Sequence, residues 1–190
     1  MTTATRLDLL VRQLDTSYEA LRERCEGMTD DEYLWEPVPG CVTVRRHGDR
    51  WTFDAGGHDA DPPPFVTIAG RLAHLTNGCL LSRWDWTFGS HSMREHREFF
   101  GTAAEGLAAF DDAFRKWRDG LGTLTDDQLD VVGLSQLPDG LDPDLPFGDI
   151  LWWNNRELIH HGAEIAMLRD LWVHSHQPAG RVNHRESVDG

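Results

Sequence analysis

Hydrophobic residues recur every three or four positions in four stretches of the chain, the spacing of one buried face of an α-helix. The first stretch predicts a helix from Thr5 to Glu26, with Thr5 as its N-cap and Asp8 in its first turn. The next three predict helices from Thr67 through Trp84, from Ala103 to Leu121, and from Phe147 to about Trp172. Four helices with short and long connections predict an all-α four-helix bundle.

The hydrophobic pattern changes to alternation between Cys41 and Phe53, on either side of His47, Gly48 and Asp49. Alternation around a turn of this composition predicts a small β-hairpin inserted between the first two helices. Residues 176–190 contain few apolar residues and no periodicity, which predicts a flexible tail after a single domain over residues 1–175.

Composition narrows the functional classes. A length of 190 residues fits one domain, and a net charge of −14 argues against nucleic acid or an anionic membrane surface as partner. The N-terminus has no uninterrupted apolar segment, and no apolar run approaches the roughly 18 residues of a membrane span, so we expect a cytoplasmic protein. Cys25, Cys41 and Cys79 are odd in number and form no C-x-x-C pair, which argues against a disulfide framework and a cysteine zinc site.

Glu157 and His161 are the strongest candidates for chemistry. The dinucleotide, P-loop, H-E-x-x-H and G-x-S-x-G motifs are absent, whereas these two residues lie four apart on one face of the last helix. The same face carries Ile150, Ile165, Leu168 and Trp172. A buried carboxylate is costly unless it is paired or binds a metal. The pair therefore supplies two ligands of a metal site, or it has a structural role in which Glu157 bonds either His161 or an arginine.

His74 is the best-placed third ligand. It adjoins the apolar face formed by Ile68, Leu72 and Leu75 on the second helix. Taken alone, such a histidine is a core or boundary residue; joined to Glu157 and His161, it completes a three-ligand set that leaves an open coordination position.

Other polar and aromatic residues have competing interpretations. His160 and Glu164 repeat the four-residue spacing, so they form a rival pair, or Glu164 supports the ligands instead. The remaining histidines are expected to be solvated (His91, His96, His174, His176) or to rim a pocket (His47, His58). The tryptophans near the site helices are expected in the core (Trp84, Trp86, Trp152, Trp153), and nearby arginines either receive an anion or are paired (Arg71, Arg83, Arg156).

Three segments resemble the DinB-like superfamily. They are WNNRELIHHGAEIAMLRDL at 153–171, TIAGRLAHL at 67–75 and MTDDEYLWEP at 28–37. The match spans most of the chain from Thr5 to Trp172, without the hairpin, residues 89–98 and the tail. Glu157 stands where many relatives have histidine, a departure similar to the mycothiol-dependent isomerase and transferase branch. His161-Gly162-Ala163-Glu164 departs from the H-R-G-Q of many relatives.

The resemblance implies a dimeric four-helix bundle with a divalent metal on His74, Glu157 and His161, and Glu164 beside them. It implies a thiol S-transferase or isomerase that uses mycothiol or another low-molecular-weight thiol. Two histidines and one carboxylate suit Zn²⁺, and Ni²⁺ also fits. We expect Arg83 and Trp153 to contact a small-molecule substrate. A metal-dependent hydrolase and a non-catalytic homodimeric or binding bundle are the alternatives.

Overall fold

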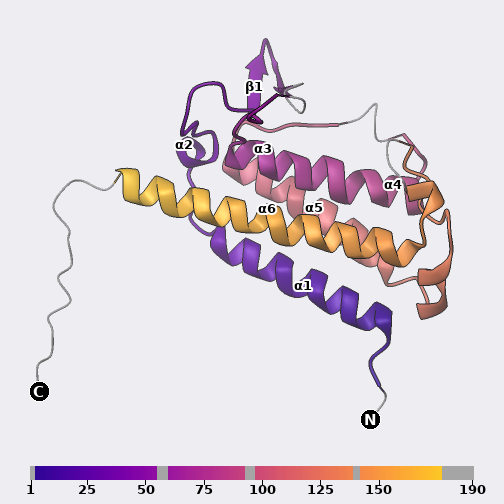
Figure 1. Ribbon diagram of the computed structural model, residues 1–190. Coiled ribbons are helices and arrows are strands. Elements are labelled where there is room, and N and C mark those ends of the chain that lie inside the picture. The colour runs from indigo at the N-terminus through magenta and orange to yellow at the C-terminus, as the bar shows by residue number, and fades with distance from the viewer. Residues whose placement is uncertain (1–2, 55–59, 93–96, 139–141, 177–190) are drawn as a thin grey trace, which may run out of the picture.

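The computed structural model describes residues 3–54, 60–92, 97–138 and 142–176 (Figure 1). The protein is mostly helical, with one small two-stranded sheet. The helices and strands are, in chain order, α1 (Arg6–Arg24), α2 (Asp30–Tyr33), β1 (Val44–His47), β2 (Arg50–Phe53), α3 (Ile68–Ala73), η1 (His74–Leu81), α4 (Ser82–Phe88), α5 (Ala103–Leu121), η3 (Asp126–Asp130), η4 (Asp142–Asp144) and α6 (Phe147–His176).

Threonine side chains begin three of the long helical segments. Thr5 and Asp8 form a capping box at the start of α1, the N-terminus that the sequence predicts. Thr67 accepts a hydrogen bond from the backbone of Gly70 at the start of α3, and Thr102 does the same at the start of α5. These caps fix where each helix starts and therefore which residues face its neighbours.

The helix expected from Thr67 through Trp84 runs on to Phe88 and is a π-helix in its middle, from His74 to Leu81. The hydroxyl of Ser82 donates to the carbonyl of Asn77, and Nη1 of Arg83 donates to that of Gly78 at 3.4 Å. Each bond reaches back five residues, so both side chains satisfy carbonyls of the widened turn. The π-helix begins at His74 and changes which residues beyond it face the interior.

Helix α6 lies beside both α1 and the continuous segment α3–η1–α4, and α5 packs against that segment behind α6 (Figure 1). The shared core is aromatic at one end, where Trp117 stands between Phe88 and Phe147 with ring centroids 5.9 and 6.0 Å away. Trp117 and Phe147 have no exposed surface. Because α6 packs against both α1 and the α3–η1–α4 segment, its buried residues, from Phe147 to Leu168, have fixed positions.

The predicted hairpin is present as β1 and β2, which pair antiparallel with Val44 opposite Phe53. Gly48 has a φ of +62° in the turn, a conformation that favours glycine. Next to the hairpin, the amide of Thr67 donates to the carbonyl of Val42, so this part of the chain holds the start of α3. The insertion thereby anchors the helix that carries His74.

Some expectations need correction. Trp152 is not a core residue: 56% of it is exposed, because it lies in the walls of two surface cavities rather than in the packed interior. Helix α6 ends at His176 rather than near Trp172, and the rest of the predicted tail lies outside the described residues. Within the described part of the chain, no helix has the length and apolar character needed to cross a membrane.

Candidate metal centre

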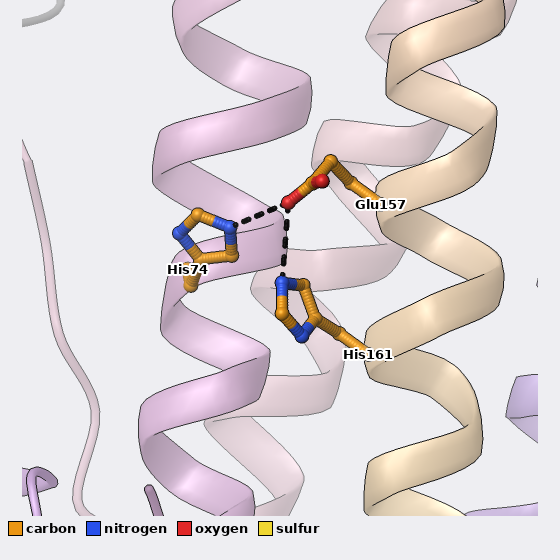
Figure 2. Close-up of side chains that lie close together, drawn as sticks. All are labelled: His74, Glu157 and His161. Atoms are coloured by element: carbon orange, nitrogen blue, oxygen red, sulfur yellow. Dashed lines mark hydrogen bonds and ion pairs between the residues drawn. The ribbon is translucent and has the colours of Figure 1, made fainter. Parts of the chain in front are cut away.

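His74, Glu157 and His161 converge between η1 and α6 (Figure 2). Nε2 of His74 lies 3.3 Å from Oε2 of Glu157, and Nε2 of His161 lies 3.1 Å from the same oxygen. The side chains of Glu157 and His161 are 8% and 9% exposed, whereas that of His74 is 39% exposed. Two imidazoles therefore point at one buried carboxylate oxygen, and the cluster is open to solvent on the His74 side.

The spacing of these donors fits a metal ion. The three donor atoms all lie within 4.8 Å of one another. Two ligands that are each about 2.1 Å from a tetrahedral ion are separated by about 3.4 Å. The observed separations of 3.3 and 3.1 Å are close to that value. The set of two imidazole nitrogens and one carboxylate oxygen also matches catalytic zinc sites.

Proton positions on His161 give a second reason to place a cation here. Its Nδ1 lies 2.7 Å from Oε2 of Glu164, so Nδ1 must carry a hydrogen that it donates. In a neutral imidazole, Nε2 then presents its lone pair to Glu157, which also presents lone pairs. A proton or a metal ion between them removes this repulsion. A histidine oriented by a carboxylate on its other nitrogen is the usual arrangement of a metal ligand.

The charges around Glu157 keep it ionised. Its second oxygen accepts a hydrogen bond from Nη2 of Arg156 at 2.6 Å. Burial acts to raise the pKa of Glu157, but the hydrogen bonds from Arg156 and His74 outweigh it and hold the pKa below its ordinary value. Burial also lowers the pKa of His74, against the opposing effect of Glu157. A charged carboxylate and a neutral imidazole are the forms that bind metals.

The sequence allows two roles for Glu164: partner of His160 in a rival pair, or a residue that supports the metal ligands. Glu164 bonds His161 at 2.7 Å and Arg71 at 2.6 Å, while His160 is 3.4 Å away. His160, His161 and Glu164 also form a three-donor group, but His160 is exposed and Arg71 already neutralises the carboxylate. The geometry is that of a residue that orients His161.

Arg83 and Trp153 lie in the wall of a cavity of about 600 Å³. The guanidinium of Arg83 stacks on Trp153 at 4.0 Å and pairs with Asp142 at 3.2 Å, so it is not free to receive an anion as a bare cation. Gly78 also lines the cavity, and a side chain at this position would meet the ring of His74. Sequence reasoning did not single out Gly78 or Asp142, although Gly78 lies four residues after His74.

The other candidates lie elsewhere. His47, His91, His174 and His176 are exposed, and His47 does not line the described cavities, while His58 and His96 fall outside the described residues. The three cysteines are buried and unpaired by disulfides. Burial raises the pKa of Cys79 to about 12. Its sulfur lies 3.4 Å from Nε2 of His74 but outside the three-donor group.

Fold and site together define a mostly helical protein with a cluster of two histidines and one glutamate between two long helical segments. The sequence model of the DinB superfamily matches residues 13–165, and the chain belongs to that superfamily. The matched range runs through the hairpin, which lies outside the three segments that resemble the family. Neither curated proteins nor solved structures gave a match. The superfamily is thus confirmed, and the thiol-dependent branch stays a prediction.

Proposed function

We propose that this chain binds one divalent metal ion, Zn²⁺ or Ni²⁺, through His74, Glu157 and His161, and catalyses a thiol-dependent transfer or isomerisation. The observation that carries the proposal is the convergence of two Nε2 atoms on one buried carboxylate oxygen at 3.3 and 3.1 Å. The thiol is of low molecular weight, of the mycothiol type, and a cytoplasmic location, where such thiols stay reduced, belongs to the same proposal.

Such an ion would supply Lewis-acid chemistry, lowering the pKa of a thiol beside it toward neutrality. The protein's own residues set the conditions. Arg156 holds one oxygen of Glu157 and leaves the other facing the imidazoles. Glu164 keeps the proton of His161 on Nδ1, and Arg71 balances the charge of Glu164. Glutamate as the single charged ligand, in place of the commoner histidine, supports the resemblance to thiol-dependent relatives.

The test is thiol conjugation of 1-chloro-2,4-dinitrobenzene by protein loaded with Zn²⁺. The thiol sulfur replaces chloride on the ring, chloride leaves, and the thiol proton goes to the buffer. We expect turnover with mycothiol that is lost in Glu157→Gln and kept in Glu23→Gln, an exposed glutamate on α1. Hydrolysis of 4-nitrophenyl acetate without thiol, combined with no conjugation, would contradict the transferase and favour the hydrolase.

We further propose that the long helical segments form the four-helix bundle of the family and that two copies associate through α6 and α1. Five large apolar side chains of α6 are exposed, among them Ile159, Met167 and Leu171. Beside them, Ala20, Gly162, Ala163 and Ala166 line a shallow groove between α1 and α6. When two copies are related by a two-fold axis, the protruding side chains of one copy can fit against the small residues of the other. With 30 residues, α6 is about 45 Å long, enough for an ordinary dimer interface.

A further inference from the structure

A cavity is lined by residues of η1, α4 and α6 together with Leu137, Asp142 and Leu145, and Gly78 in its wall is four residues after His74 of the candidate metal centre. Its volume of about 600 Å³ is within the range of small-molecule sites. We propose that this cavity is the substrate pocket, that it selects an uncharged aromatic or apolar body, and that Gly78 joins it to His74. This inference rests on the proposed function, because it names the substrate class of the same site.

The charges in the cavity wall cancel. Arg83 and Asp142 form a buried pair whose side chains are 7% and 5% exposed, and Ser135 donates a further hydrogen bond to Asp142 at 3.0 Å. Within the described ranges, the wall has two further charged residues, Arg97 and Asp149, which have opposite signs and are exposed. The described part of the wall therefore offers no net charge to an ionic substrate.

Apart from Gly78 and Ser82, the rest of the described wall is apolar and aromatic. Leu137, Leu145 and Ile150 supply aliphatic surface, and Trp152 and Trp153 supply two indoles from adjacent positions of α6. Arg83 covers part of Trp153 at 4.0 Å, whereas Trp152 leaves 56% of its surface exposed. An exposed indole beside aliphatic groups favours a flat apolar body by contact area and ring stacking.

Gly78 connects this pocket to the cluster. A methyl group built on Gly78 would lie 3.1 Å from Nδ1 of His74, closer than an ordinary contact. Gly78 lines the cavity, and the absence of a side chain there leaves the space between the cavity wall and the His74 ring free of a methyl group. On this proposal a molecule in the pocket approaches the cluster past Gly78, next to the partly exposed His74.

The first experiment measures binding of 2-naphthol, an uncharged aromatic probe, to the metal-free protein by ligand-observed NMR titration. We expect saturable binding that weakens about tenfold in Trp152→Ala, because one aromatic contact and its buried area are lost. Phe65→Ala is the matched control: Phe65 is 45% exposed and does not line the cavity, so the affinity should stay at the wild-type value. No binding, or equal weakening in both variants, would overturn the inference.

The second experiment compares the relaxation of 2-naphthol protons with protein loaded with Co²⁺ and with Zn²⁺. Faster relaxation with Co²⁺ is expected, because the paramagnetic ion lies beside the pocket, and His161→Ala should remove the difference. Equal relaxation with both loaded forms of the wild type would show that the pocket is separate from the cluster and would overturn the role of Gly78. Failure to retain either metal would instead refute the proposed function, while the metal-free titration still decides whether the pocket binds the probe.

Discussion

Glu164 offers the sharpest test of how the centre is built, because it touches His161 without joining the three-donor set. Its Oε2 accepts the Nδ1 hydrogen of His161 at 2.7 Å, the length of a charge-assisted hydrogen bond. In Glu164→Gln the amide oxygen can still accept this hydrogen but the charge is lost. In Glu164→Ala both the charge and the orienting contact are lost.

The expected size of the effect follows from the contacts. Loss of a residue that orients a metal-binding histidine costs about 10- to 100-fold in metal affinity, or about 1.4–2.8 kcal/mol. Glu164 is 29% exposed and shares its charge with Arg71 at 2.6 Å, and both features weaken its electrostatic effect on His161. We therefore expect about a tenfold loss for Glu164→Gln and a loss closer to 100-fold for Glu164→Ala.

The assay is competition for Zn²⁺ against a chromophoric chelator at fixed pH and ionic strength, with Glu23→Gln as a control for the change in net charge. His160→Ala should leave the affinity within about twofold of wild type, since His160 is exposed and outside the proposed ligand set. Wild-type affinity in Glu164→Ala, with an unchanged urea midpoint, would refute the orienting role. A collapse of affinity in His160→Ala would move the ion to the rival group.

Three further outcomes are expected. Gly106→Ala should lower the free energy of unfolding, measured in urea, by about 1–3 kcal/mol, because the new methyl group would lie 2.5 Å from the hydroxyl of Tyr33. Gly162→Ala should raise the free energy of unfolding by up to about 1 kcal/mol, because its methyl group would meet only ordinary contacts. The opposite order of the two variants would contradict the packing. Burial lowers the pKa of His74, so below about pH 6.5 the unfolded chain binds the proton more readily. The stability of the metal-free protein should therefore fall as the pH falls through the pKa of folded His74, and the urea midpoint of His74→Gln should depend less on pH; equal dependence would contradict the shift. Met167→Glu should shift the wild-type dimer to monomer in light scattering, since Met167 is 69% exposed on the proposed interface; a monomeric wild type or an unaffected dimer would refute that interface.

The sequence predicts the helices and the hairpin well because their signals are local. The capping pair of Thr5 and Asp8, the alternation around Gly48 and the four-residue spacing of Glu157 and His161 each depend on neighbours within one turn. Proximity of His74 to that pair depends on how two distant helices pack, and here the apolar face of the second helix was a sufficient guide.

The features that sequence patterns missed depend on tertiary contacts. The π-helix from His74 to Leu81 has hydrogen bonds between residues five apart instead of four, which a pattern of 3.6 residues per turn does not register. Asp142 meets Arg83 across 59 positions of the chain. Trp152 was expected in the core by residue type, whereas its place on α6 exposes it.

The central claim is that His74, Glu157 and His161 hold a divalent metal ion. Its most direct test is elemental analysis of protein purified without an affinity tag or chelator, comparing wild type, His161→Ala and His160→Ala. The account predicts about one equivalent of metal in wild type and His160→Ala, and loss of that metal in His161→Ala. No metal in the wild type after reconstitution with Zn²⁺ or Ni²⁺, or full retention in His161→Ala, would contradict it.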